Sequence, residues 1–121
     1  MRNKYGNRKV KTADGMVFDS QKEAQRYGVL KLLERAGKIS DLQMQVRFTL
    51  IPEQRMPDTL GPKGGRRKGM VLEKACTYLA DFVYTENGKT IVEDCKGHKT
   101  EVYRIKKKLM LYVHGIRIRE T

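Results

Sequence analysis

Residues 76–96, which read CTYLADFVYTENGKTIVEDCK, constrain the fold of this chain more than any other stretch. Two runs rich in β-forming residues flank the dipeptide Asn87-Gly88. This dipeptide favours a two-residue type I′ turn, because both central residues of that turn need a positive φ. The sequence therefore predicts a β-hairpin with one strand on either side of the turn.

Side chains alternate between the two faces of a strand, so the hairpin has a predicted polar face. Asp81 is expected there beside Leu79 and Val83, and across the turn Asp94 and Lys96 are expected on the same face. Charged groups next to apolar side chains are costly unless they are paired or bind a metal. The pattern indicates a functional site. The opposite face is expected to hold Tyr78, Ala80, Phe82 and Tyr84 of the first run, and Ile91, Glu93 and Cys95 of the second.

Net charge is the most unusual bulk property of the chain. The sequence has 26 lysine and arginine residues against 14 aspartates and glutamates, which gives a formal charge of +12. Such an excess attracts polyanions, of which nucleic acid is the usual one. Residues 1–8 are expected to form a flexible basic arm, with Tyr5 placed to stack on a base. An anionic membrane surface is the weaker alternative, because no helix combines a basic face with an aromatic one.

Length and composition set coarser limits. A chain of 121 residues is expected to form one domain, residues 1–121, with a single modest core. No apolar run approaches the roughly 20 residues that span a bilayer, and the basic N-terminus lacks the apolar segment of a secretory signal. We therefore expect a cytoplasmic protein without a membrane partner. Cys76 and Cys95 are too few for a disulfide framework.

Three elements are predicted before residue 53. Asp14-Gly15 predicts a small hairpin within residues 9–18. A helix over 19–36 begins with the capping box of Ser20 and Glu23 and ends at Gly37. A half-buried strand over 39–52 follows. The apolar positions expected to be buried are Ala24, Tyr27, Leu30, Leu33 and Ala36 of the helix, and Leu42, Met44, Val46, Phe48 and Leu50 of the strand.

Residues 53–72 are rich in glycine, proline and basic residues, and they are expected to form a long mobile loop. A basic loop of this kind suits a nucleic-acid clamp. Its expected nucleic-acid contacts are Lys63, Arg66, Arg67 and Lys68.

After the central hairpin, Thr100 is the predicted N-cap of a helix over 101–113, which Gly115 ends before a last short strand. The buried stripe of this helix is expected at Val102, Ile105, Leu109 and Tyr112, and phosphate contacts are expected at Lys99, Arg104 and Lys107. Leaving out the first small hairpin, the predicted order is α-β-β-β-α-β, an α/β fold.

Asp81 and Asp94 suit a divalent metal, because Mg²⁺ prefers oxygen ligands and usually takes one or two carboxylates. Lys96, two residues after Asp94, is placed to polarise an attacking water. Glu23 faces the core side of its helix and can reach such a site, although capping Ser20 is its ordinary role. A cross-strand salt bridge is the alternative without a metal. A zinc site is a remote alternative because the spacing of its ligands would be irregular; they would be Cys76, Cys95, His98 and His114.

The chain resembles the PD-(D/E)xK nuclease superfamily, and more narrowly a small phage-encoded family within it that includes Holliday-junction-resolvase-like members. The resemblance rests on FDSQKEAQRY (18–27), YLADFVYTENGKTIVEDCKG (78–97) and TEVYRIKKKLM (100–110). It implies a restriction-endonuclease-like core with a mixed sheet flanked by helices. It also implies that Asp81 and Asp94 bind metal and that Lys96 is the motif lysine. Glu23 stands where some resolvases have a further glutamate.

The sequence departs from the superfamily pattern at two positions. Ala80 replaces the usual proline, and Glu93 beside Asp94 is a second possible ligand. Strand alternation places Asp94 on the face of Asp81, so Glu93 is expected to support the site from the other face.

The resemblance implies a DNA endonuclease that depends on Mg²⁺ or Mn²⁺, works in the cytoplasm of a bacterial host and acts on branched DNA such as Holliday junctions during recombination. Symmetric cutting of two strands would need a C2 homodimer. Two alternatives stay open. One is a non-catalytic nucleic-acid-binding protein with a nuclease-like fold, and the other is a phage regulator that binds a host protein.

Overall fold

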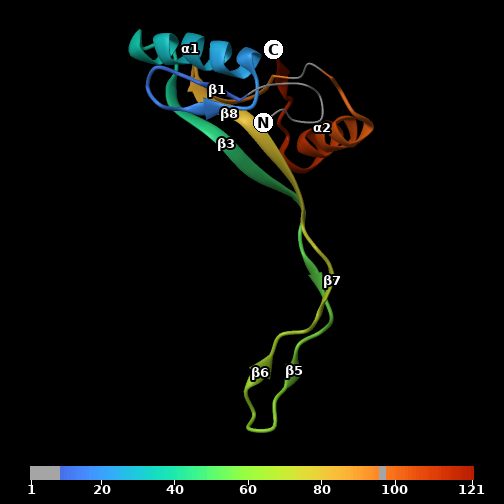
Figure 1. Ribbon diagram of the computed structural model, residues 1–121. Coiled ribbons are helices and arrows are strands. Elements are labelled where there is room, and N and C mark those ends of the chain that lie inside the picture. Colours follow the sequence, from blue (N-terminus) through green and yellow to red (C-terminus); the bar gives the residue numbers. More distant parts are fainter. Residues whose placement is uncertain (1–8, 96–97) are drawn as a thin grey trace.

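The computed structural model describes residues 9–95 and 98–121, and its elements follow the predicted order. The predicted α/β fold, the α-β-β-β-α-β order and the small N-terminal hairpin are confirmed (Figure 1). The body of the molecule consists of β1 (Val10–Lys11), β2 (Val17–Phe18), α1 (Gln21–Arg35), β3 (Ser40–Ile51), β8 (Cys76–Glu86), β9 (Lys89–Asp94), α2 (Glu101–His114) and β10 (Arg119–Glu120).

A four-stranded mixed sheet in the order β10-β9-β8-β3 forms the centre of the body. β3 and β9 both run antiparallel to β8, whereas β10 is parallel to β9. The turn between β8 and β9 is the one the sequence predicts, since Asn87 has a φ of 51° and Gly88 a φ of 75°.

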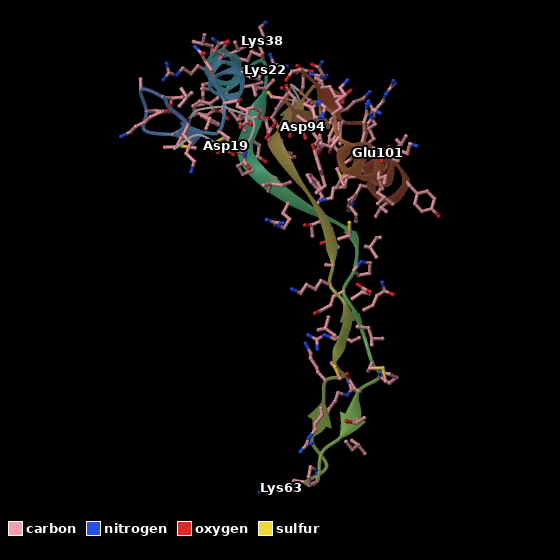
Figure 2. The ribbon with its side chains drawn as sticks, turned by 45° about the vertical axis from the view of Figure 1, so that its right-hand side comes forward. Asp19, Lys22, Lys38, Lys63, Asp94 and Glu101 are labelled. Carbon is pink, nitrogen blue, oxygen red and sulfur yellow. The ribbon has the colours of Figure 1, made fainter. Side chains whose placement is uncertain are left out.

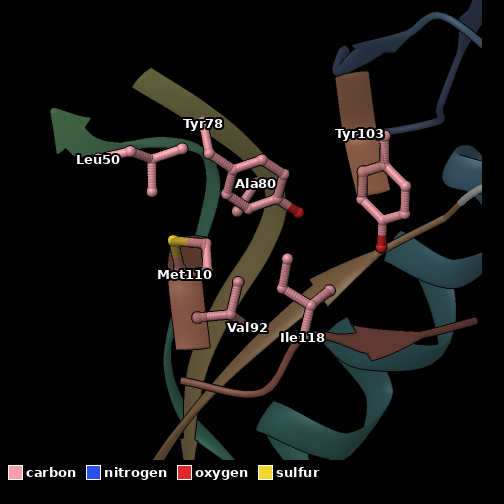
Figure 3. Packing of buried hydrophobic residues seen from close by; sticks show 7 residues of the cluster. All are labelled: Leu50, Tyr78, Ala80, Val92, Tyr103, Met110 and Ile118. Atoms are coloured by element: carbon pink, nitrogen blue, oxygen red, sulfur yellow. The ribbon is translucent and has the colours of Figure 1, made fainter. Parts of the chain in front are cut away.

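Two hydrophobic clusters cover the two faces of this sheet. Ile91 packs against one cluster and its neighbour Val92 belongs to the other, as the alternation of a strand requires. The buried residues of the α1 cluster are Phe18, Tyr27, Leu30, Ile39, Phe82 and Tyr84. Those of the α2 cluster are Leu50, Tyr78, Ala80, Val92, Tyr103, Met110 and Ile118 (Figure 3).

The helix ends are set by local signals, as predicted. The hydroxyl of Ser20 accepts a hydrogen bond from the backbone N–H of Glu23 at 3.1 Å, and that of Thr100 accepts one from Tyr103 at the same distance. Gly37 and Gly115 follow the two helices with φ values of 74° and 68°. In the described part of the chain, neither helix has the length and apolar content needed to cross a membrane.

The predicted buried stripe of α2 is wrong at three of its four positions, whereas Leu109 is half-buried against the α2 cluster. Tyr103 and Met110 are the buried residues of this helix, whereas Val102, Ile105 and Tyr112 are exposed. The Tyr103 side chain packs near Tyr78 and donates its hydroxyl hydrogen to Glu120, which turns the helix away from its most apolar stripe. Ala36 is also exposed, because α1 ends one residue before it.

β8 breaks the predicted alternation at Asp81. Tyr78 and Ala80 pack in the α2 cluster, whereas Phe82 and Tyr84 pack in the α1 cluster, although all four were expected on one face. On β3, Gln45 lies opposite Asp81 in the register and has a φ of 54°. A residue in the left-handed region rotates the chain that follows it, so the paired strands exchange faces together.

Residues 52–75, hereafter the ribbon, form a two-stranded extension rather than the predicted unstructured loop (Figure 1). β4 (Gln54–Arg55) pairs with β7 (Val71–Glu73), and β5 (Thr59–Leu60) pairs with β6 (Arg66–Arg67). A segment rich in glycine and proline, with few apolar residues to bury, is not expected to form strands. Main-chain pairing supplies the order instead, as in the 2.8 Å hydrogen bond from Met56 N–H to the Met70 carbonyl.

Candidate metal and nucleic-acid site

Asp81 and Asp94 lie close together on neighbouring strands. The register of β8 and β9 pairs Phe82 with Glu93, and Asp81 and Asp94 are the next residues along the two strands. Cys95, the residue after Asp94, donates its backbone N–H to Asp81, so the two aspartates are close neighbours. The structure therefore juxtaposes the two aspartates that the sequence singled out.

Asp94 is 1% exposed, and the hydroxyl of Tyr78 donates a hydrogen bond to its Oδ2 atom. Burial raises the pKa of Tyr78, and the hydrogen bond to Asp94 raises it further, so the phenol stays protonated as a donor at neutral pH. Burial likewise raises the pKa of Tyr103, with added effects of Glu120 and of the charges on Asp94 and Asp81. Two neutral tyrosines thus lie on the α2 side of the aspartate pair.

Asp81 is half-buried, and its Oδ2 atom accepts a hydrogen bond from the backbone N–H of Cys95 at 2.8 Å. This bond fixes the end of β9 against β8. Burial raises the pKa of the Cys95 thiol, and the negative charges of Asp81, Glu23 and Glu93 raise it further. The thiol is therefore neutral at physiological pH, and Glu23 of α1 lies within electrostatic range of the same point.

Glu93 occupies the opposite face of β9, as predicted. It is fully buried, and Arg26 of α1 donates to both of its carboxylate oxygens at 2.8 and 2.7 Å. The hydroxyl of Tyr84 also donates to Glu93, and Arg119 contacts that hydroxyl at 3.1 Å. Burial and the bond to Glu93 raise the pKa of Tyr84 to about 12. Sequence reasoning missed Arg26, although its position beside Tyr27 at the edge of the buried stripe of α1 was a usable signal.

Glu120 is a carboxylate that sequence reasoning also missed. The parallel pairing of β10 with β9 aligns Glu120 with Asp94, so acidic residues occupy neighbouring positions on β8, β9 and β10. Lys107 donates to Glu120 at 2.8 Å, Tyr103 donates at 2.8 Å and Lys99 lies at 3.4 Å. These contacts lower the pKa of Glu120 to about 2, and the hydrogen bond from Lys107 has the largest effect. Glu120 lies in a strand of two residues, which is too short to show an alternating pattern in the sequence.

The predicted phosphate-binding cations fall into two groups. Lys99 and Lys107 pair with Glu120 beside the aspartates, and Arg104 is exposed on α2. The ribbon cations lie far from this point, as the positions of Lys63 and Asp94 show (Figure 2). Lys96 lies outside the described residues, as do the predicted basic arm at residues 1–8 and Gly97.

Carboxylate oxygens are the donor type that Mg²⁺ prefers, so Asp81 and Asp94 suit this ion chemically. Across residues 9–95 and 98–121, however, no three His, Cys, Asp or Glu side chains gather as a metal-binding group. The zinc alternative has no support, because His114 contacts the Thr49 carbonyl at 2.7 Å and Cys76 packs against the α2 cluster.

A search among curated proteins found no match, and neither did a search among solved structures. The family model described as "Protein of unknown function (DUF1064)" matches residues 2–118, nearly the whole chain. The chain belongs to the DUF1064 family.

Proposed function

We propose that this protein is a metal-dependent DNA endonuclease of the PD-(D/E)xK type. The observation that carries the proposal is the closeness of Asp81 to Asp94 at the point where β9 ends. The α-β-β-β-α-β order, the nearby Glu23 of α1 and the formal charge of +12 add support.

Each of the two aspartates is oriented by a contact of its own. The Tyr78 hydroxyl holds Asp94, and the Cys95 N–H holds Asp81. Asp81, Asp94 and Glu23 would hold Mg²⁺ or Mn²⁺, and the ion would stabilise charge on the scissile phosphate and lower the pKa of a bound water. The resemblance assigns placement of the attacking water to Lys96.

The finer substrate is part of the same proposal. The resemblance favours branched DNA of the Holliday-junction type, cut by a C2 homodimer in the cytoplasm of a bacterial host. The charge of the chain supports a polyanionic substrate, and Arg104 is exposed on the surface of α2.

The test compares cleavage of a four-way junction, a linear duplex and a single strand, each with Mg²⁺ and with EDTA. Cleavage is expected with Mg²⁺ only, preferentially on the junction, and Asp94→Asn is expected to abolish it. Asparagine keeps an oxygen that accepts from Tyr78, so this variant removes charge at little cost to folding.

Asp41→Asn is the matched control for that assay. Asp41 is exposed on β3 with a φ of 58°, a conformation that asparagine tolerates, so this variant removes the same charge elsewhere and should cleave normally. Cleavage that persists in Asp94→Asn would overturn the proposal.

A non-catalytic DNA-binding protein with this fold is the second candidate. It is favoured by the deep burial of Asp94 and by the lack of a three-residue metal-binding group within the described ranges. Salt-sensitive DNA binding without cleavage, unchanged by Asp94→Asn, would select this function. Absence of DNA binding at moderate salt would leave a regulator that binds a host protein.

A further inference from the structure

We infer that the ribbon is a duplex-DNA-binding arm that contacts phosphates about one helical turn beyond the edge of the body. This inference rests on the DNA substrate of the proposed function but not on cleavage. It differs from the predicted loop in having a fixed reach and a defined binding end, which is the tip between Thr59 and Gly69.

Charge is concentrated at this tip. Residues 59–69 contain four cations and no carboxylate, and the four are Lys63, Arg66, Arg67 and Lys68. All four are exposed, and Arg66 makes a weak ion pair with Asp58 at 3.7 Å. No carboxylate of the described residues pairs with Lys63, Arg67 or Lys68. Exposed arginines and lysines gathered in this way bind phosphates and release counterions from DNA.

The tip also has a shape that accepts a phosphate group. An open hollow of about 370 Å³ is lined by Gly61, Pro62, Lys63, Gly65, Arg66 and Arg67. A tight turn forms it, since Gly61 N–H donates to the Gly65 carbonyl at 2.6 Å and Gly64 has a φ of 82°. Three cationic side chains around one hollow attract the negative charge of a phosphodiester.

The stem, which is the part of the ribbon between the body and the tip, gives the arm its reach. From Pro52 to Pro62 an extended chain spans about 35 Å, and the rise of duplex DNA makes this about ten base pairs. The major groove admits a two-stranded ribbon, which favours duplex over single-stranded DNA. Leu60 and Met70, 78% and 74% exposed, add apolar contact area for sugars and base edges.

Glycine at position 69 shows that the stem is closely built. A Cβ atom there would lie 1.8 Å from the Met56 carbonyl oxygen, so the two strands cross where a side chain has no room. Arg55 donates to the Gly69 carbonyl at 2.8 Å, and Asp58 accepts from the Gly69 N–H at 3.0 Å. These contacts hold the two strands of the ribbon together just below the tip.

The experiment measures DNA affinity in EDTA, so that no strand is cut. The tip variant carries glutamine at the four tip cations, and the control variant carries glutamine at Lys11, Lys22, Arg35 and Lys38, which are exposed on the body. Both lose the same net charge. Each protein is titrated with a 30-bp duplex and with a single strand of equal length, from about 50 to 200 mM salt.

For the tip variant we expect at least a tenfold loss of duplex affinity and a slope of log K against log salt that is shallower by about 3–4. The control variant should change that slope by less than about 1. On a duplex of about 8 bp, too short to reach both body and tip, wild type and tip variant should bind alike.

Equal losses in the two variants would show a general charge effect and overturn the inference. So would equal losses on single strand and duplex, or an unchanged duplex affinity of the tip variant, which would leave the ribbon to a protein partner. The cleavage assay with Asp94→Asn reports separately on the proposed function, because that substitution leaves the tip intact.

Discussion

Arg26 and Glu93 form a two-bond ion pair, with Nε to Oε1 at 2.8 Å and Nη2 to Oε2 at 2.7 Å, that fastens α1 to the middle of the sheet. Glu93 is fully buried, so its charge depends on this guanidinium and on the Tyr84 hydroxyl. The pair lies on the face opposite Asp94, one residue along the same strand. The position of α1, and of Glu23 on it, therefore depends on a contact on the far side of the candidate site.

Arg26→Met should destabilise the protein by about 3–5 kcal/mol, because it leaves the buried Glu93 carboxylate without its cation. Urea unfolding measures the loss, and adding Glu93→Gln should recover part of it. Lys31→Met is the control, since Lys31 and Glu34 form a largely exposed pair at 3.3 Å that is worth less than about 1 kcal/mol. Similar losses for the two single variants would contradict a buried-charge explanation.

Glu120→Gln should remove a stabilising effect that depends on pH. The pKa of Glu120 is about 2 in the folded protein, below its usual 4.5, so the charged form contributes stability above about pH 4.5. That contribution is lost as pH falls towards 2. Because the side chain is 23% exposed, we expect a wild-type advantage of about 1–2 kcal/mol at neutral pH that disappears near pH 2.

Urea unfolding of both proteins across this pH range tests the Glu120 prediction. Glu73→Gln, an exposed substitution on the ribbon, should give no pH-dependent difference from wild type. A constant difference between wild type and Glu120→Gln at every pH would refute the ionic explanation.

Met110→Ala should cost about 2–5 kcal/mol, because Met110 is fully buried in the α2 cluster and its truncation leaves a cavity. Tyr112→Ala should cost less than about 0.5 kcal/mol, because Tyr112 is 88% exposed. Thermal or urea unfolding compares the two. A larger loss of unfolding free energy from Tyr112→Ala than from Met110→Ala would instead support the buried stripe that the sequence predicted.

Gly69→Ala should open the ribbon without unfolding the body, because the new methyl group would overlap the Met56 carbonyl. Amide hydrogen exchange at Met56, whose N–H donates to the Met70 carbonyl, should rise, while the unfolding midpoint of the body stays unchanged. Gly65→Ala is the matched control, since a Cβ atom at Gly65 has no neighbour within 4 Å. Equal exchange in both variants would show that the Gly69 crossing does not hold the ribbon.

Local signals made most of the fold predictable. Asn87-Gly88 fixed a turn, and Ser20, Thr100 and Gly115 marked helix ends, because each acts through its own backbone or the next few residues. The neighbouring positions of Asp81 and Asp94 on β8 and β9 followed from that one turn and its hairpin register. Such features need no knowledge of the rest of the molecule.

The errors came from features that depend on distant contacts. Tyr103 is buried in preference to Val102 because its hydroxyl donates a hydrogen bond to Glu120 on β10. The exchange of faces at Asp81 depends on Gln45, which belongs to another strand. Arg26 finds its partner 67 residues away. None of these pairings leaves a periodic trace in the sequence.

The ribbon grows directly out of the sheet, since Ile51 and Cys76, which bound it, are paired with each other. β8 continues from Cys76 through Asp81, so the tip and the candidate site share one pair of extended chains. Force on Lys63 therefore travels along covalent backbone into the strands around Asp81. A bent or stretched polymer bound at the tip would therefore apply force to the strands that carry the carboxylates, and the size of that force would depend on the curvature of the polymer.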